Sequence, residues 1–175
     1  MSHRIKVYKN FLREDNCKLF IDRFNLGQLE LFEDNPNIKI INADDTKNTI
    51  DILSRTIVQH IAKDFGFLRE LELQKGYFTL WEPGSEAGLH IDSHAGSENV
   101  IFSFVIYLNS NFGGGEIYFP YQEFTHSPEA GDLVLFPSGG KEYAHQVNQI
   151  QNNNRYTIAG WYIQKGSLPR LEVMQ

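Results

Sequence analysis

The fold is indicated by residues 100–137, which read VIFSFVIYLNSNFGGGEIYFPYQEFTHSPEAGDLVLFP. This stretch contains three apolar runs, at 100–109, 115–120 and 132–137, separated by segments rich in Asn, Gly, Ser and Pro. Short apolar runs bounded by such turn residues predict β-strands. The pattern extends in both directions, and the expected strands are 71–81, 87–93, 100–109, 115–120, 132–137, 144–149 and 155–164. Evenly spaced short strands favour an antiparallel sandwich or jelly roll.

The first third of the chain has a different pattern. From 46 to 65 the apolar residues recur every three or four positions, which predicts an amphipathic helix, and Gly66 is suited to end it. A shorter helix is expected at 13–24, and strands at 6–8 and 38–41. We therefore expect a mainly β fold of the α+β class.

Length, charge and cysteine content limit the classes of protein. A chain of 175 residues is expected to form one domain, 1–175, with a mostly helical segment at 1–70 and a jelly-roll core at 71–175. The formal net charge of -6 argues against a nucleic-acid partner. Cys17 is the single cysteine, so no intramolecular disulfide can form. The sequence shows no membrane-length apolar stretch and no signal peptide, and a soluble, cytoplasmic protein is expected.

A candidate metal site begins at His90-Ile91-Asp92. Side chains alternate across a strand, so His90 and Asp92 point the same way and can reach one ion. His145 lies on another expected strand and could supply a second imidazole. Two neutral nitrogen ligands and one carboxylate suit a non-haem iron(II) that activates oxygen.

The segments around these residues carry a resemblance. In chain order they are 81–84, 107–109, 113–116, 119–120, 128–132, 135–136, Arg155 and Trp161. In order and spacing, residues 77–164 resemble the iron(II)/2-oxoglutarate-dependent oxygenases of the prolyl 4-hydroxylase-like family. The resemblance implies a double-stranded β-helix barrel, with the N-terminal helices bracing one sheet.

The same resemblance implies roles for individual residues. His90, Asp92 and His145 would hold iron(II), and Arg155 would bind the distal carboxylate of the cosubstrate 2-oxoglutarate. A guanidinium suits that role, because its fork of N–H donors matches a carboxylate. The hydroxyl of Tyr107 is expected to share this carboxylate.

Three further residues are expected near the cosubstrate. Thr157 shares a strand face with Arg155, and Tyr77 shares one with Trp81. Trp81 stands where many relatives have a tyrosine, and Ser103 stands where relatives often have a threonine. Both departures leave the metal ligands in place.

The activity implied is that of a dioxygenase, most simply a hydroxylase of prolyl residues in a peptide or protein. It would use O2, convert 2-oxoglutarate to succinate and CO2, and have ascorbate as a further candidate cofactor. The presence of Asp92 favours hydroxylation over halogenation, because related halogenases lack the carboxylate. Three alternatives stay open: an oxygenase acting on a free amino acid or small metabolite, a cupin-like metal enzyme without a keto acid, and a non-catalytic β-sandwich binding module.

The remaining histidines and one loop complete the expectations. His94 continues the alternation of 90 and 92, but as a fourth ligand it would block a position that oxygen or the cosubstrate needs. His3, His60 and His126 are expected to be solvated and without a role. Residues 83–88 are expected to form a mobile flap at the mouth of the site.

The connection between His145 and Arg155 allows a geometric prediction. In a tight hairpin of 145–150 with 155–160, Arg155 would not share a face with His145. Both side chains can face one cavity if the two segments belong to facing sheets. We therefore predict an arch between two sheets, or a bulge, at this connection.

Overall fold

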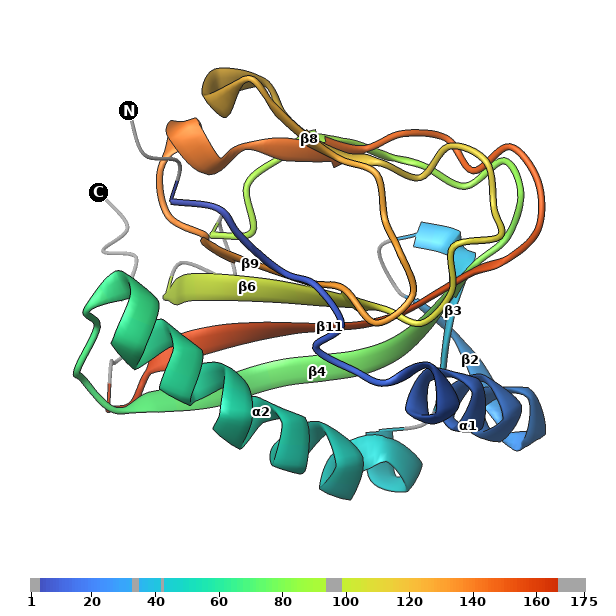
Figure 1. The fold of residues 1–175 in the computed structure, drawn as a ribbon, viewed down its shortest axis with the longest axis horizontal. Coiled ribbons are helices and arrows are strands. Elements are labelled where there is room, and N and C mark those ends of the chain that lie inside the picture. Colours follow the sequence, from blue (N-terminus) through green and yellow to red (C-terminus); the bar gives the residue numbers. More distant parts are fainter. Residues whose placement is uncertain (1–3, 33–34, 42, 94–98, 167–175) are drawn as a thin grey trace, which may run out of the picture.

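The computed structural model describes residues 4–32, 35–41, 43–93 and 99–166, and it has a layered fold (Figure 1). The helices are α1 (Glu14–Leu26) and α2 (Ala43–Phe65), with short 3-10 turns η1 (Pro120–Gln122) and η2 (Lys141–Tyr143). The strands are β1 (Lys6–Tyr8), β2 (Leu29–Phe32), β3 (Asn35–Ile41), β4 (Leu71–Trp81), β5 (Ala87–His90), β6 (Val100–Tyr107), β7 (Ile117–Phe119), β8 (Phe124–His126), β9 (Leu133–Pro137), β10 (His145–Val147) and β11 (Arg155–Gln164).

The strands form two antiparallel sheets that face each other. The larger sheet has the order β1-β9-β6-β11-β4-β3-β2, and the smaller has the order β5-β10-β7-β8. Because β10 and β11 follow each other but belong to different sheets, the chain crosses between sheets after β10. The predicted arch and the predicted double-stranded β-helix are both confirmed.

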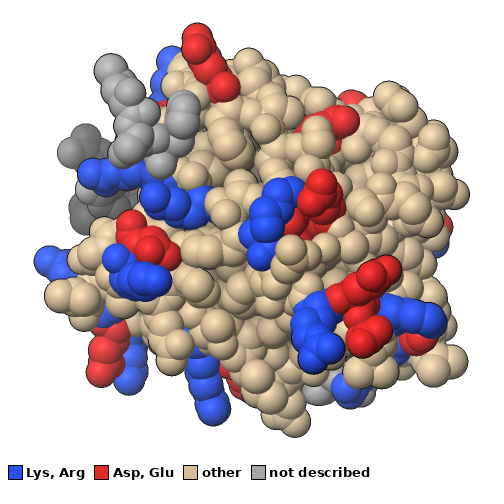
Figure 2. Space-filling model, in the orientation of Figure 1, with Lys and Arg blue, Asp and Glu red and all other residues tan. Residues whose placement is uncertain are grey.

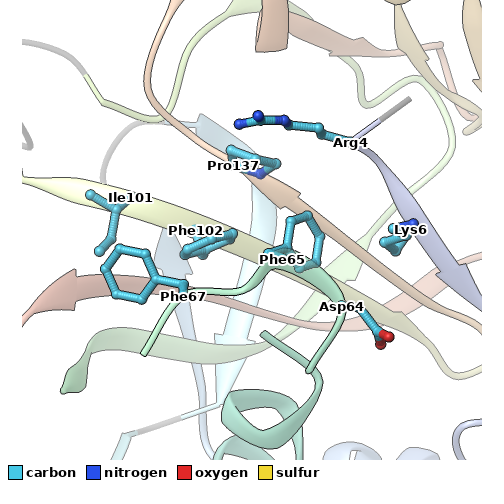
Figure 3. Close-up of a pocket in the computed structure, with 8 residues that line it drawn as sticks. All are labelled: Arg4, Lys6, Asp64, Phe65, Phe67, Ile101, Phe102 and Pro137. Atoms are coloured by element: carbon cyan, nitrogen blue, oxygen red, sulfur yellow. The ribbon is translucent and has the colours of Figure 1, made fainter. Parts of the chain in front are cut away.

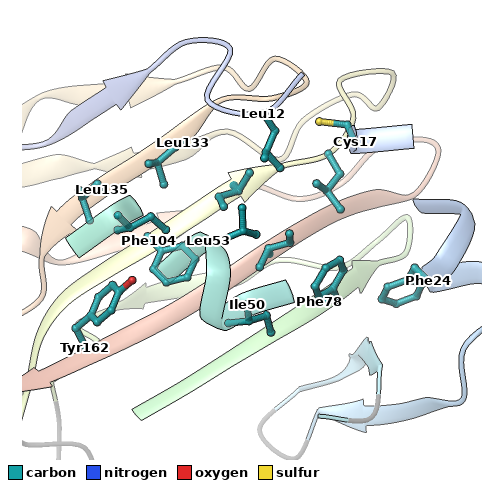
Figure 4. Packing of buried hydrophobic residues seen from close by; sticks show 14 of the residues in the cluster. Leu12, Cys17, Phe24, Ile50, Leu53, Phe78, Phe104, Leu133, Leu135 and Tyr162 are labelled. Atoms are coloured by element: carbon teal, nitrogen blue, oxygen red, sulfur yellow. The ribbon is translucent and has the colours of Figure 1, made fainter. Parts of the chain in front are cut away.

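The central strands of the larger sheet are covered on both faces, and alternation along these strands separates two environments. One face packs against α1 and α2, which lie below the sheet in Figure 1. Phe78, Phe104 and Ile158 belong to this core, together with Ile50 and Leu53 of α2, and most of them are labelled in Figure 4. The odd-numbered neighbours on β4, β6 and β11 point to the smaller sheet instead. The helices therefore stabilise the sheet from outside and leave its inner face for a site.

Most element boundaries agree with the predictions to within three residues. The strands at 71–81 and 155–164 have the predicted bounds, whereas the strand expected at 87–93 ends at His90. α2 begins at Ala43, three residues before its predicted start, and Gly66 has the left-handed φ of +67° that ends a helix. Strands β2 and β8 were not predicted from the sequence. The N-terminal segment contributes β1, β2 and β3 to the larger sheet.

Acidic and basic side chains lie beside one another on the surface shown in Figure 2. Pairs such as Lys18–Asp22 and Lys47–Asp51 join residues one helical turn apart. Within the described ranges, neither helix has an apolar stretch of membrane-crossing length.

Candidate active site

Two neighbouring strands of the smaller sheet bring the candidate metal ligands together. β5 and β10 run antiparallel, and His90 is paired directly with His145. Asp92 lies in the bend just after β5, with its Oδ1 atom 3.5 Å from Nε2 of His90 and 3.9 Å from Nε2 of His145. One ligand atom from each of the three residues lies within 4.8 Å of the other two, so together they could hold one metal ion.

Backbone carbonyls fix the orientation of both imidazoles. Nδ1 of His90 lies 2.7 Å from the carbonyl oxygen of Gly88, and Nδ1 of His145 lies 3.1 Å from that of Tyr143. A carbonyl can only accept, so each Nδ1 carries the hydrogen and each Nε2 keeps its lone pair. This is the arrangement in which a ligating histidine is held by a partner on its other nitrogen. The two free Nε2 atoms are the ones that face Asp92.

The electrostatic environment keeps Asp92 charged. Burial alone would raise the pKa of Asp92, but its polar contacts with His90, His145 and Ser103 outweigh burial, and the pKa is lowered. Burial lowers the pKa of His145. Burial also acts to lower the pKa of His90, but its contacts with Asp92 and the Gly88 carbonyl raise it overall. The cluster therefore pairs an ionised carboxylate with a buried, neutral imidazole.

Arg155 is a buried cation that lacks an anion among the described residues. It is 2% exposed, at the start of β11, and its guanidinium lies 4.8 Å from the ring of Trp81 and 5.0 Å from the ring of Tyr107. Nε of Arg155 and the hydroxyl of Tyr107 are both buried without a hydrogen-bond partner in the described structure. Buried charges are normally paired, so this arrangement fits an anionic ligand that completes the site.

Hydroxyl groups line the wall next to Arg155. Thr157 is paired with Thr79 across β11 and β4, and their hydroxyl oxygens lie 2.5 Å apart. The indole N–H of Trp81 donates to the hydroxyl of Thr79 over 3.2 Å. These bonds connect Thr157 and Trp81, two of the predicted neighbours of the cosubstrate, through the hydroxyl of Thr79.

One cavity of about 540 Å³ connects the two groups. Seven of the eight predicted site residues line it: His90, Asp92, His145, Arg155, Thr157, Tyr77 and Trp81. Tyr107 does not line this cavity; it is fully buried behind Arg155. The three candidate metal ligands and the guanidinium of Arg155 therefore face the same cavity.

The structure also shows lining residues that the sequence analysis did not single out. Phe32 and Ile38 come from the β2–β3 hairpin, and the ring of Phe32 packs on Tyr77 with centroids 5.7 Å apart. Neither residue carries a motif, because the surrounding segment is polar and its pairing with β4 is not visible in the sequence. Ser103 lines the cavity too, and its hydroxyl lies 2.5 Å from that of Ser138.

Two of the expectations for the remaining histidines were wrong. His126 is not solvated: its side chain is 8% exposed, and Nε2 lies 3.0 Å from Oδ2 of Asp132. His60 is half-buried, with its ring 4.3 Å from that of Tyr8. His3 and His94 lie outside the described residues.

The segment 83–88, expected to be a mobile flap, is tied down in its first half. Ser85 is buried, and its hydroxyl donates to the carbonyl of Asn37 over 3.0 Å. Gly84 donates to the carbonyl of Ile150, whose own N–H donates to the carbonyl of Ser85. These bonds fasten the turn to the arch that follows β10. Its second half, Glu86 to Gly88, leads into β5 and lines the cavity.

A second cavity, of about 390 Å³, lies where the end of α2 meets β1 and β6 (Figure 3). Its lining includes Phe65, Phe67 and Phe102, with Arg4 and Lys6 at one side. It contains one carboxylate, that of Asp64, and no imidazole, so it lacks a metal-ligand set.

Comparison with known proteins agrees with this geometry. The model of the 2OG-Fe(II) oxygenase superfamily matches residues 76–163, and the chain belongs to that superfamily. It is accordingly a dioxygenase that depends on iron(II) and 2-oxoglutarate. The ligand set and the unpaired guanidinium described above fit both groups. No curated protein matches the chain in sequence.

Solved structures of prolyl hydroxylases share the fold. A Pseudomonas putida prolyl-4-hydroxylase is 26% identical, with a TM-score of 0.69 over 94% of this chain and 95% of that one. The viral collagen prolyl hydroxylase of Paramecium Bursaria Chlorella virus-1, in its 2-oxoglutarate complex, is 14% identical, with a TM-score of 0.72 over 93% of this chain and 97% of that one. A Trichoplax adhaerens prolyl hydroxylase, bound to a hypoxia inducible factor peptide, is 18% identical, with a TM-score of 0.70 over 94% and 85%.

Proposed function

We propose that this dioxygenase hydroxylates prolyl residues in a peptide or protein, with His90, Asp92 and His145 as the ligands of iron(II). Arg155 is proposed to bind the distal carboxylate of 2-oxoglutarate. The observation that carries the proposal is the single cavity into which both the three ligand atoms and the unpaired, buried guanidinium open.

Each ligand has a defined part in holding the metal. The Nε2 atoms of His90 and His145 are kept free by the carbonyls that accept from Nδ1. Asp92, ionised in this environment, supplies the negative charge that offsets the cation. Three protein ligands leave the other coordination positions open for the cosubstrate and oxygen.

Apolar side chains around the proposed ligands limit the access of water and hold the ligand side chains in one orientation. The rings of Phe119 and Phe136 lie 5.1 Å and 4.9 Å from the ring of His145 and 4.9 Å from each other, so the imidazole packs against a pair of apolar rings. Ile117 and Val147 add apolar surface to the cavity. A dry, rigid surrounding strengthens electrostatic interactions within the site.

The cosubstrate end of the cavity is built for a carboxylate. Arg155 offers a fork of donors, and the rings of Trp81 and Tyr107 hold its guanidinium between them. We propose that the Thr157 hydroxyl also contacts the cosubstrate, with Trp81 and Tyr77 forming the wall beside it and Tyr107 reaching it only through Arg155. Bound iron(II) and 2-oxoglutarate supply the oxidising chemistry, in which decarboxylation to succinate and CO2 is coupled to hydroxylation.

The proposed substrate class is supported by the relatives. The Pseudomonas putida prolyl-4-hydroxylase resembles this chain over nearly the whole of both lengths, and its name states its activity. The Trichoplax adhaerens relative was solved with a peptide bound. A cytoplasmic location is also proposed, because the one cysteine is a buried free thiol that suits a reducing compartment.

A substrate screen tests the function. The iron-loaded protein is incubated with 2-oxoglutarate, O2 and either proline-containing peptides or free amino acids, with ascorbate present or absent. Succinate release together with one added oxygen on a prolyl residue of a peptide supports the proposal. An added oxygen on free amino acids alone would replace it with the small-metabolite alternative. Iron binding without any succinate release would contradict it altogether.

A further inference from the structure

A second buried group of titratable side chains lies behind the cosubstrate end of the cavity. His126 on β8 and Asp132, just before β9, have side chains that are 8% and 1% exposed. Neither residue lines the cavity, and neither belongs to the metal site. Burial of a carboxylate and an imidazole at one place is costly unless the pair has partners.

Asp132 is held firmly in this position. Its Oδ2 atom accepts from Nζ of Lys9 over 2.9 Å and from the N–H of Glu129 over 3.1 Å. Nε2 of His126 lies 3.0 Å from the same oxygen, in contact with it but not aligned as a hydrogen bond. The carboxylate is thus neutralised by Lys9 at the surface and is covered by His126 on the inside.

Asp132 and its neighbour Gly131 hold the backbone of Tyr107, and His126 contacts its ring. The backbone N–H of Tyr107 donates to the carbonyl of Asp132 over 2.9 Å, and its carbonyl accepts from Gly131 over 2.8 Å. The ring of His126 packs against the ring of Tyr107 with centroids 5.7 Å apart. Backbone, carboxylate, imidazole and phenol ring therefore form a closed set of contacts around Tyr107.

Tyr107 in turn contacts Arg155. Its ring lies 5.0 Å from the guanidinium. Tyr107 is on β6 and Trp81 is on β4, and these two strands flank β11 on either side. Tyr107 is paired with Thr157 of β11. A shift of the phenol ring would remove one of the two rings between which the guanidinium lies. The affinity of Arg155 for a carboxylate depends on that placement, because bidentate bonding has strict geometry.

We propose that His126 and Asp132 are a positioning pair that holds Tyr107 against Arg155 and thereby sets the affinity for 2-oxoglutarate. The inference rests on the proposed role of Arg155. The polar contact of Nε2 of His126 with Asp132 fixes the neutral imidazole ring in place against the phenol. Burial lowers the pKa of His126, which agrees with a neutral ring at this position.

Binding of 2-oxoglutarate to the iron(II)-loaded protein under anaerobic conditions tests the proposal. His126→Phe keeps a ring but loses the polar contact, and Asp132→Asn removes the charge. Both should weaken 2-oxoglutarate binding about tenfold, a typical effect of losing a group that orients a ligand-binding side chain. The affinity for iron(II) should stay within about twofold of the wild-type value, because the metal ligands lie on other strands. A merely structural role would lower both affinities together.

Two further variants sharpen the result. His60→Phe is a matched control, since His60 also contacts a carboxylate (Asp64, 3.5 Å) and a tyrosine ring but lies away from the cavity; it should bind 2-oxoglutarate like the wild type. If the variants at His126 and Asp132 do not fold, Lys9→Met serves instead. Lys9 is half-exposed and contacts Asp132 from outside, and its loss should weaken 2-oxoglutarate binding about threefold.

The failure of this inference differs from the failure of the proposed function. If the wild type binds 2-oxoglutarate, Arg155→Ala abolishes binding and His126→Phe leaves binding unchanged, the positioning role is refuted while the function stands. If Arg155→Ala also binds like the wild type, the role of Arg155 is wrong, and the positioning pair is refuted with it.

Discussion

The imidazoles of His90 and His145 face each other across two adjacent strands of the smaller sheet, with ring centroids 4.4 Å apart. Because strand pairing sets this distance, the two proposed nitrogen ligands are already side by side without a bound metal. Asp92 completes the set from the bend after β5. A site built on paired strands is more rigid than one built on loops, which favours a fixed geometry for catalysis.

Removal of the carboxylate should abolish turnover of 2-oxoglutarate without unfolding the protein. Asp92→Ala deletes the one charged ligand, whereas the core between the helices and the larger sheet is untouched. Succinate release measures the activity, and far-ultraviolet circular dichroism measures the fold. Asp51→Ala is the control, because Asp51 is an exposed partner of Lys47 on α2 and should keep full activity. Wild-type turnover in the Asp92 variant would refute the assignment.

Replacement of Arg155 should separate cosubstrate binding from stability. Arg155→Met should weaken 2-oxoglutarate binding by roughly 1.5–3 kcal/mol for each charge-assisted hydrogen bond that is lost. The ligand-free protein should become more stable by about 1 kcal/mol, because the variant replaces a buried, unpaired charge with an apolar chain of similar size. Calorimetric titration and urea unfolding measure the two effects. Unchanged binding would exclude Arg155 as the partner of the carboxylate.

Metal affinity should fall as the pH decreases, mainly through His90. Contacts with Asp92 and the Gly88 carbonyl raise the pKa of His90 above the ordinary value of 6.5, so protons already compete with the metal at His90 above that pH. The pKa values of Asp92 and His145 are lowered, so both are already in the metal-binding form in that range. Affinity should therefore rise about tenfold per pH unit below the pKa of His90 and level off above it.

Manganese(II), which is stable in air, can be used for the measurement across about pH 5.5 to 8. Metal binding near pH 6.5 should release about one proton, which calorimetry in buffers of different ionisation enthalpy detects. An affinity independent of pH over this range would contradict the assignment of His90 as a ligand.

The turn before β7 should tolerate no side chain. Gly115 has φ of +71°, and a Cβ there would lie 2.7 Å from Cδ1 of Ile150 and 3.2 Å from Cδ of Arg155. Gly115→Ala should therefore cost about 1–2 kcal/mol of backbone strain, with a steric term in addition, and should weaken 2-oxoglutarate binding. Gly84→Ala is the control, since Gly84 has φ of +91° but open space around it, and its variant should show the backbone term alone. Equal losses of stability, measured by urea unfolding, would show that the packing around Arg155 is not tight.

Much of the barrel could be predicted, because local pattern and burial agree there. β11 is predicted with its observed bounds since its apolar run begins directly after Asn152 to Asn154 and Arg155 opens it. Side-chain parity predicts an arch or a bulge after β10 if His145 and Arg155 share a cavity, and the structure has the arch. His90 and Asp92 were expected on one face of a strand at 87–93, but that strand ends at His90, and Asp92 reaches the two histidines from the bend after it.

The rest depends on contacts between segments that are distant in sequence. β2 reads Leu-Glu-Leu-Phe and is largely exposed, so it carries no burial signal, and its pairing with β3 defines it. His126 stands next to Ser127 and Pro128, which suggests a loop, but Asp132 and Tyr107 enclose it in the fold. The hydroxyl of Tyr107 was expected to share the cosubstrate carboxylate; the residue does not line the cavity, and its ring lies 5.0 Å from the guanidinium of Arg155.

The most direct test of the shared metal site is an anaerobic titration of the apoprotein with iron(II) in the presence of 2-oxoglutarate, followed by visible absorbance. The wild type should give one absorbance change that saturates at one iron per chain, and His145→Ala and Asp92→Ala should each lose it. An unchanged absorbance titration in both variants would contradict a site shared by His90, Asp92 and His145.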